Sequence, residues 1–282
     1  MFKKVLVAID ASGPSMELLN AVDDLKRMGM EELVIVHVIR TETAGIGLGT
    51  RRKRFLENIE QKKDEFISSG LKVNIFQPIG NPAEEIRSLA AEENVDLILI
   101  GSLGAGSLVR KLFLGSTAAD VIRGTKKSVL VEKYTRENGG FKRVPIFREG
   151  KPTTVLIATD FSKSSLHIFD TILEQPGVFD RVVLYNVVDE GFTDEQLAKN
   201  TERARRKLEE WRVEFEERGF EVETDVSVGV ASELIIEASK QKDISLLAIS
   251  RRGRSPIDEL VIGSTADHIV RRSVCPVLLL KG

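Results

Sequence analysis

The sequence predicts an α/β protein with two domains, each built on a parallel β-sheet that helices cover. First, the 282-residue chain repeats itself, so that Asp10 and Asp160, 150 residues apart, follow matching strands. Second, short β-branched runs alternate with helical patterns in both copies, as in βα units. Third, runs such as 97–100 (Leu-Ile-Leu-Ile) are continuously apolar, which is typical of strands buried on both faces.

The internal repeat joins four blocks of the first half to four of the second. The blocks 4–12, 34–39, 80–86 and 114–122 return as 154–162, 183–188, 229–235 and 262–270. The offset between matching blocks changes only from 150 to 148 residues, which indicates two homologous units. We therefore expect domains at residues 1–134 and 153–282. The segment 135–152 contains Gly and Pro amid charges and is predicted as a linker, part of which is apolar enough to dock on a domain.

In the first copy, strands are predicted at 4–9, 33–39, 72–78, 96–100 and 128–132, and helices at 15–28, 52–68, 82–92 and 116–123. In the second copy, strands are predicted near 154–159, 181–187, 221–228, 245–250 and 276–280. The longest helix there, about 193–217, is charged on one face and apolar on the other, at Leu197, Ala204, Leu208, Trp211 and Phe215.

Composition excludes several classes of function. The 41 basic and 43 acidic side chains lack the basic excess of a nucleic-acid binder, so we expect no nucleic-acid partner. A single cysteine, Cys275, excludes a disulfide framework, and three widely spaced histidines make no zinc motif. The apolar stretch at 5–9 is too short for a signal-peptide core, and no run reaches the roughly 20 apolar residues of a membrane span. We expect a cytoplasmic protein without a membrane partner.

Two strand ends in each copy carry the candidate chemistry. The first strand runs into Asp10 and Ser12, and in the repeat into Asp160 and Ser162. Open parallel sheets bind ligands beyond the carboxyl ends of their strands, where the strand order reverses. The fourth strand runs into a glycine-containing turn and then into a Gly-Ser-Thr that opens a helix, at 115–117 and 263–265.

The Gly-Ser-Thr segments predict an anion site. Glycine lets the backbone approach a ligand closely, and a helix start offers free N–H groups, two hydroxyls and the positive end of the helix dipole. The alternative is that Ser116 and Ser264 merely cap their helices. Because the glycine turn accompanies the segment in both copies, we favour phosphate binding.

This arrangement resembles the universal stress protein family. The motif that carries the resemblance is Gly-x2-Gly-x9-Gly-Ser/Thr after the fourth strand, with an Asp after the first, and its two copies are similar to the tandem members. The resemblance covers nearly the whole chain outside the linker. It implies two Rossmann-like domains, each a five-stranded parallel sheet in the order 3-2-1-4-5, with the Asp loop and the glycine loop facing one crevice. It also implies binding of ATP or AMP there, with Mg²⁺ accompanying ATP, while other members bind no nucleotide.

Each copy departs once from the family pattern. In the first, ten residues rather than nine separate Gly104 from Gly115. In the second, the spacing from Gly253 to Gly263 is kept, but Ser250 replaces the first glycine. We expect nucleotide in at least one of the two sites.

The resemblance implies site residues position by position. In the first copy they are Asp10, Ser12, Val38, Gly101, Gly104, Gly115, Ser116 and Thr117. In the second copy they are Asp160, Ser162, Val187, Ser250, Gly253, Arg254, Gly263, Ser264 and Thr265. The glycines and hydroxyls would hold ribose and phosphates, the Asp would face the nucleoside or a phosphate-bound metal, and the Val would offer main-chain groups to adenine.

Some polar residues have two interpretations. Arg251, Arg252 and Arg254 either neutralise phosphate or form a solvated loop. The basic residues within 203–207 lie among glutamates, where salt pairs along the helix suffice. His37 lies in a buried strand and is interpreted as structural.

Three hypotheses for function stay open. The first is an adenine-nucleotide-binding (ATP, ADP or AMP) stress-response or regulatory protein whose bound state is read by a protein partner. The second is a slow metal-dependent ATPase or nucleotidyl-transfer enzyme using Asp10 or Asp160. The third is an interaction module that has lost nucleotide binding. The sequence has no P-loop, no dinucleotide fingerprint and no Gly-x-Ser-x-Gly elbow, which favours binding over efficient catalysis.

The predicted fifth strands, 128–132 and 276–280, are apolar sheet edges, which invite pairing. In the family that the chain resembles, fifth strands pair antiparallel across a dimer. We therefore predict that the two halves form an internal pseudo-dimer, and a homodimer of two chains stays open.

Overall fold

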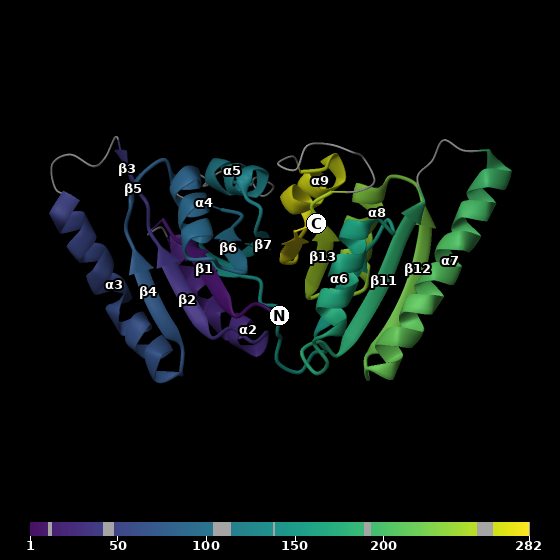
Figure 1. Cartoon of the computed structure of the whole chain (residues 1–282), viewed down its shortest axis with the longest axis horizontal. Coiled ribbons are helices and arrows are strands. Elements are labelled where there is room, and N and C mark those ends of the chain that lie inside the picture. The colour runs from purple at the N-terminus through teal and green to yellow at the C-terminus, as the bar shows by residue number, and fades with distance from the viewer. Residues whose placement is uncertain are drawn as a thin grey trace. The chain divides into compact units, whose positions relative to one another are not determined.

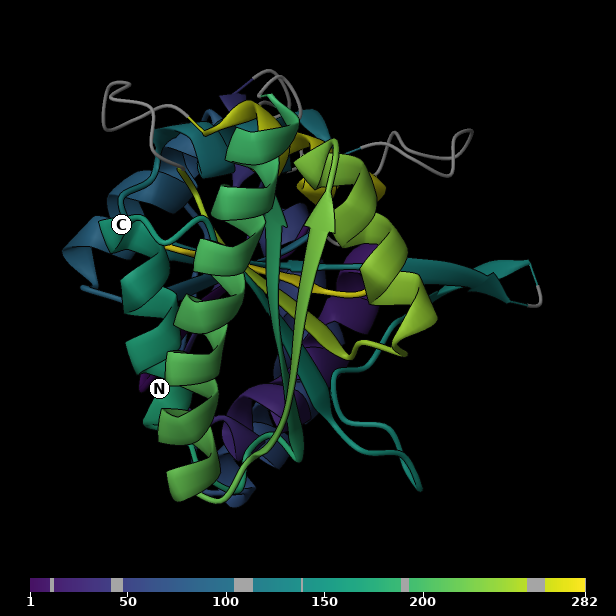
Figure 2. The same ribbon diagram turned by 90° about the vertical axis from the view of Figure 1, so that its right-hand side faces the viewer.

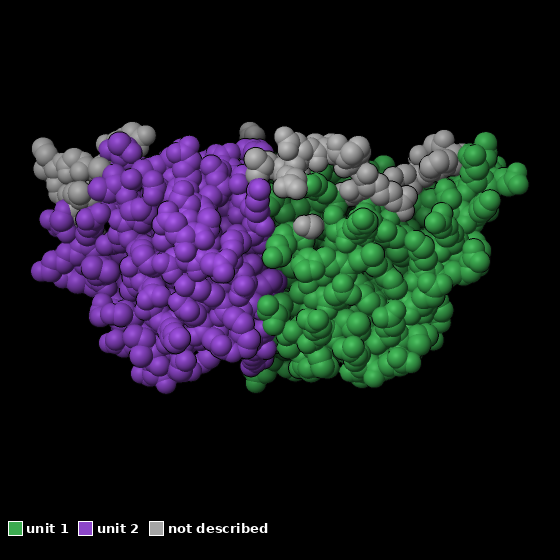
Figure 3. Space-filling model, in the orientation of Figure 1, with its two compact units in different colours: residues 1, 144–282 green, residues 2–143 purple. Residues whose placement is uncertain are grey.

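The computed structural model of this chain describes residues 1–10, 13–41, 48–103, 114–137, 139–188, 193–252 and 262–281. The chain divides into two compact units, one of residues 2–143 and one of residue 1 with residues 144–282 (Figure 3). The division lies inside the segment 135–152 that the sequence predicts as a linker. Both units alternate strands and helices, which confirms the α/β fold class.

In the unit of residues 2–143, parallel strands form a sheet in the order β4-β2-β1-β6-β7 (Figure 1). The strands are β1 (Lys4–Ala8), β2 (Glu32–Val36), β4 (Lys72–Phe76), β6 (Leu97–Gly101) and β7 (Ser128–Glu132). The order therefore reverses between β1 and β6, and a ligand crevice is expected beyond their carboxyl ends.

The helical elements of this unit follow the predicted pattern with one exception. They are α1 (Gly13–Glu17), the 3₁₀ turn η1 (Leu18–Ala21), α2 (Val22–Arg27), α3 (Leu48–Ser68), α4 (Pro82–Glu92) and α5 (Ser116–Gly124). A short parallel pair, β3 (Ile39–Arg40) with β5 (Ile79–Gly80), lies beyond β2 and β4.

The exception is the segment 15–28, which the sequence predicts as one helix and the structure divides into α1, η1 and α2. The guanidinium of Arg143 donates from Nη2 to the carbonyl oxygen of Asn20, 3.4 Å away, inside the 3₁₀ turn. Helices kink where a side chain inserts into the backbone hydrogen-bond ladder. The prediction of one α-helix is therefore wrong at Leu18–Ala21, where the backbone is a 3₁₀ turn on which Arg143 docks.

This arginine belongs to an antiparallel hairpin of β8 (Tyr134–Glu137) and β9 (Gly140–Arg143). Nη1 of Arg143 lies 2.7 Å from Oδ2 of Asp24 and 3.4 Å from Oε1 of Glu132, and all three side chains are buried. Burial raises the pKa of Glu132 to about 7, with Arg143 opposing the shift. The first part of the predicted linker therefore docks on the unit of residues 2–143.

In the unit of residues 144–282, parallel strands lie in the order β12-β11-β10-β13-β14. They are β10 (Thr154–Ala158), β11 (Arg181–Val188), β12 (Glu221–Val228), β13 (Leu246–Ser250) and β14 (Val277–Leu280). In chain order this is 3-2-1-4-5, the order that the resemblance implied for each domain. The reversal lies between β10 and β13.

Helices cover both faces of this second sheet. They are α6 (Lys163–Leu173), α7 (Asp194–Glu217), α8 (Ala231–Gln241) and α9 (Ser264–Arg272). Figure 2 shows α6 and α7 on one face of β11 and β12, with α8 on the other. The side chains of Val155, Leu156 and Ile157 on β10 are consequently fully buried.

The fifth strand of each unit neighbours the fourth, since β7 pairs with β6 and β14 pairs with β13. The pairing of the two fifth strands with each other stays a prediction. Across the part of the chain that the structure describes, no helix is both long and apolar enough to cross a lipid bilayer.

Candidate functional site

Asp160 follows β10, where the strand order of its unit reverses. Oδ1 of Asp160 accepts hydrogen bonds from the Ser162 amide (3.0 Å) and the Ser165 hydroxyl (2.6 Å). Ser162 is the N-cap of α6, and its hydroxyl accepts from the Ser165 amide (3.4 Å). These bonds fix the Asp160 carboxylate to the start of α6 and give Ser162 a role in holding the loop.

The next residue, Phe161, has a left-handed backbone with a φ of +61°. For a bulky residue this conformation costs on the order of 1–3 kcal/mol and persists only where the surroundings hold it. The Phe161 ring meets Trp211 of α7 edge to face, with centroids 5.6 Å apart, and Nζ of Lys207 lies 4.8 Å from the Phe161 centroid. Aromatic and cation–π contacts thus join the Asp160 loop to α7.

Asn186 ties the end of β11 to the end of β10. Its Nδ2 donates to the Thr159 carbonyl (2.7 Å), and the Thr159 amide donates to the Tyr185 carbonyl (2.9 Å). The pairing of the two strands is therefore extended by one residue beyond β10. Val187 follows Asn186 on β11 and is half-buried.

The start of α9 offers backbone N–H groups rather than a capped end. Gly263 is the N-cap and provides no side-chain hydrogen bond, while its amide donates to the Arg251 carbonyl (2.9 Å). Ser264 and Thr265 form the first turn and are exposed. The interpretation that Ser264 caps the helix is therefore wrong, because it lies one residue inside. N–H groups without a side-chain acceptor, at the positive end of the dipole, suit an anion.

The end of β13 adds charge beside this helix start. The Ser250 hydroxyl donates to the Arg252 carbonyl in the same turn. Arg251 is 5% exposed, and burial together with the neighbouring Arg252 lowers its pKa to about 10. Because that pKa is far above neutral pH, Arg251 keeps a desolvated positive charge at the edge of the site.

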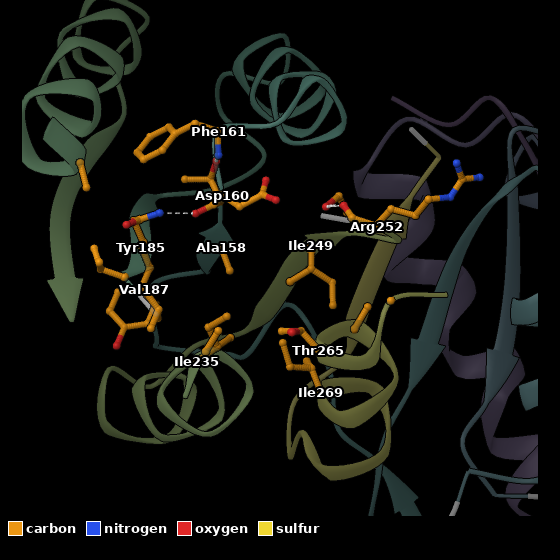
Figure 4. A pocket seen from close by; sticks show the side chains of 18 of the residues that line it. Ala158, Asp160, Phe161, Tyr185, Val187, Ile235, Ile249, Arg252, Thr265 and Ile269 are labelled. Atoms are coloured by element: carbon orange, nitrogen blue, oxygen red, sulfur yellow. Dashed lines mark hydrogen bonds between the residues drawn. The ribbon is translucent and has the colours of Figure 1, made fainter. Parts of the chain in front are cut away.

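These strand ends and helix starts line one cavity of about 590 Å³. Small-molecule sites are typically about 300–1,000 Å³. Figure 4 shows Asp160, Val187 and Ile249 around one open space, with Thr265 and Ile269 on its α9 side and Arg252 pointing away. Helix α7 supplies a further wall, made of Asn200, Arg203, Ala204 and Lys207.

The cavity brings together most of the site residues predicted for the second copy. Asp160, Val187, Ser250, Gly263, Ser264 and Thr265 all line it. Ser162 lies outside that lining and serves the loop. Gly253 and Arg254 lie outside the described residues.

Sequence reasoning missed the contribution of α7. Asn200, Arg203 and Lys207 lie on one face of the helix at spacings of three and four, beside Ala204 of the apolar stripe. That spacing could have indicated a polar face of α7 directed at the site. The sequence interpretation instead paired the basic residues with glutamates. No described acidic residue forms an ion pair with Arg203 or Lys207.

In the unit of residues 2–143, the matching elements have similar local geometry. The Asp10 amide donates to the Ser15 hydroxyl (2.8 Å), and Gly115, the N-cap of α5, donates from its amide to the Ser102 carbonyl (3.0 Å). Ser116 and Thr117 open α5, so the capping interpretation is wrong for Ser116 too. The remaining predicted residues lie beyond β2 (Val38), at the end of β6 (Gly101), or outside the described residues (Ser12 and Gly104).

The described lining of the cavity carries one carboxylate and several cationic side chains. Among the described residues that line the cavity, Asp160 is the one with a carboxylate, and none is a histidine or a cysteine. Within the described parts of the chain, no three His, Cys, Asp or Glu side chains cluster closely enough to hold a metal.

Comparison with known proteins gives the same family for both halves. The model of the universal stress protein family matches residues 1–133 and 152–281. Universal stress protein MJ0577 of Methanocaldococcus jannaschii is 30% identical over 159 residues, which cover 47% of this chain and 96% of that protein. Universal stress protein YxiE of Bacillus subtilis is 31% identical over 147 residues, which cover 46% and 99%.

A solved structure is similar over the whole chain. The crystal structure of a universal stress protein from Archaeoglobus fulgidus has a TM-score of 0.70 at 23% identity and covers 99% of this chain and 98% of its own. At this identity the likeness shows the fold alone.

Proposed function

This chain belongs to the universal stress protein family, and we propose that it binds an adenine nucleotide (ATP, ADP or AMP) in the cavity of residues 144–282. The observation that carries the proposal is the convergence of Asp160 with the open start of α9 on one cavity. A carboxylate and an anion site in one cleft suit a ligand that has both hydroxyls and phosphates.

The lining assigns a part of the nucleotide to each wall. The N–H groups and hydroxyls of Ser264 and Thr265 would hold phosphate, with the charge of Arg251 nearby. The apolar side chains of Val187 and Ile249 would pack on the base.

Asp160 would accept hydrogen bonds from ribose hydroxyls, or contact Mg²⁺ that arrives with ATP. Magnesium is usually held by one or two carboxylates together with substrate phosphates, and a single carboxylate fits that role. With no histidine or cysteine in the described lining, we propose binding rather than rapid turnover.

The proposal is tested with the full-length chain in two ways. Mass spectrometry of material released on denaturation identifies any co-purified nucleotide. Titration calorimetry with ATP, ADP and AMP then measures the affinity for each nucleotide and shows how many phosphates the site prefers. Absence of binding to all three nucleotides would favour an interaction module without ligand.

Asp160→Ala is expected to weaken binding by on the order of tenfold or more, since it removes hydrogen bonds to a charged acceptor. Asp170→Ala, an exposed carboxylate on α6, is the matched control and should leave the affinity unchanged. Equal affinity of Asp160→Ala and wild type would contradict the assigned role. Release of ADP from ATP that stops in Asp160→Ala would favour the enzyme hypothesis instead.

A further inference from the structure

The two units need not bind nucleotide equally, and matched positions on α3 and α7 allow them to be compared. Each helix is followed by a glycine with left-handed backbone, Gly70 (φ +92°) and Gly219 (φ +88°), 149 residues apart. The same offset matches Phe55 of α3 to Ala204 of α7. Ala204 lines the cavity of residues 144–282, so Phe55 marks the corresponding wall of the other unit.

Phe55 lies over the end of β2. The ring nitrogen Nδ1 of His37 contacts the Ile9 carbonyl (3.1 Å), as Asn186 contacts Thr159 in the other unit. Because a carbonyl only accepts, Nδ1 of His37 carries the proton. The Phe55 ring stacks on His37 with centroids 4.4 Å apart and planes at 13°, and Phe55 is only 3% exposed. An aromatic ring thus covers the counterpart of a residue that lines the cavity.

A second side chain fills the space at the end of β6. A Cβ atom added to Gly101 would lie 2.6 Å from the Tyr134 hydroxyl oxygen, closer than non-bonded atoms approach. The space that a glycine leaves open here is therefore occupied by Tyr134. Burial raises the pKa of Tyr134, so its hydroxyl stays protonated at neutral pH.

The positive charge at the matched lining positions also differs between the two units. Lys207 and Arg251, whose positive charges lie at the cavity of residues 144–282, are matched at the offset of 149 by the neutral residues Asn58 and Ser102. In the opposite sense, Asn200 is matched by Arg51, so the unit of residues 144–282 keeps one more cation at these matched positions. A phosphate anion therefore gains more from the site in residues 144–282.

We infer that the chain binds one equivalent of nucleotide, in the unit of residues 144–282, and that Phe55 and Tyr134 close the matching site of the other unit. This inference rests on the proposed function and specifies which unit carries it. Phe55 covers the wall that corresponds to Ala204, Tyr134 fills the end of β6, and the weaker positive charge lowers the affinity for phosphate.

Stoichiometry separates this inference from the proposed function. Calorimetric titration of the full-length chain with ATP counts the sites. Fluorescence of Trp211, the chain's one tryptophan, reports the unit of residues 144–282 through its contact with Phe161. Both curves are expected to end at one equivalent. Two calorimetric equivalents with the fluorescence change complete at the first would overturn the inference and leave the proposed function standing, whereas no binding at all would refute the proposed function.

Ala204→Phe tests the closing device directly, because it gives α7 the side chain that α3 carries. The expected result is loss of both the calorimetric and the fluorescence signal, with Ala204→Leu weakening binding less. Arg205→Phe adds the same ring at an exposed neighbouring position of α7 and should still bind one equivalent. Near-ultraviolet circular dichroism of Trp211 shows that each variant is folded. An Ala204→Phe variant that is folded and binds ATP with unchanged affinity would overturn the inference.

Discussion

Arg143→Met is expected to destabilise the unit of residues 2–143 strongly. The guanidinium lies between the buried carboxylates of Asp24 (2.7 Å) and Glu132 (3.4 Å), and Glu132 has no exposed surface. Removing one partner of a buried ion pair costs about 3–5 kcal/mol, because the remaining charge is left uncompensated. Above pH 7, where Glu132 is ionised, two carboxylates lose their cation, so the upper part of that range applies there.

The destabilisation is expected to depend on pH. Burial raises the pKa of Glu132 from 4.5 to about 7, so in the wild type its contribution to stability is present at acid pH and is lost as pH rises to about 7. That loss is on the order of 3 kcal/mol. Without Arg143 the pKa of Glu132 rises further, since the opposing cation is gone. Arg143→Met should therefore cost most at pH 8 and least near pH 5, where Glu132 is protonated.

Urea unfolding at pH 5 and pH 8, followed by circular dichroism, measures these differences. Trp211 fluorescence marks the transition of the other unit. Adding Glu132→Gln to Arg143→Met should recover part of the loss at pH 8. Arg123→Met breaks an exposed pair with Asp120 and is the control, expected to cost at most about 1 kcal/mol. A cost for Arg143→Met below about 1 kcal/mol at pH 8, or one independent of pH, would refute the reasoning.

Two further substitutions use the correspondence between the repeats. Asn186→Ala should lower the free energy of unfolding by about 1–3 kcal/mol, because the buried Thr159 carbonyl loses its hydrogen-bond donor. Asn186→His should be tolerated, because His37 makes the same contact in the other unit, and equal losses in the two variants would contradict this. Val230 caps α8 without a side-chain bond, in the backbone conformation in which Asn81 caps α4, so Val230→Asn should stabilise by about 0.5–2 kcal/mol, and a lower melting temperature would contradict that.

Local patterns predicted the strands well because burial on both faces leaves a continuous apolar run. The strand β13 was expected near 245–250 and spans Leu246–Ser250, four residues of which are buried, and α7 starts one residue after the predicted 193. The helix expected at 15–28 failed for the opposite reason. At the 3₁₀ turn the Asn20 carbonyl accepts from Arg143, more than a hundred residues away, and no local propensity carries that contact.

In the candidate site too, some positions could be predicted from the sequence and others could not. Asp160 and Gly263 could be expected in one cleft, because parallel strands meet at one edge and the order reverses between β10 and β13. The spacing of Lys207 with Asn200 and Arg203 marked one face of α7, but the position of Lys207 over Phe161 depends on how α7 packs across the sheet. The sequence shows that Phe55 and Ala204 differ at matched positions. Only the structure shows that the Phe55 ring stacks on His37 and covers that wall.

By itself, the sequence determined that this chain is a duplicated α/β protein with a carboxylate and a glycine-Ser-Thr segment at matching strand ends. These features follow from periodicity and chain order, which each residue's neighbours set. Only the tertiary structure decided which side chains enclose the cavity of residues 144–282 and which fill the other unit. That choice depends on contacts between residues far apart in sequence, which exist only once the helices pack on the sheet.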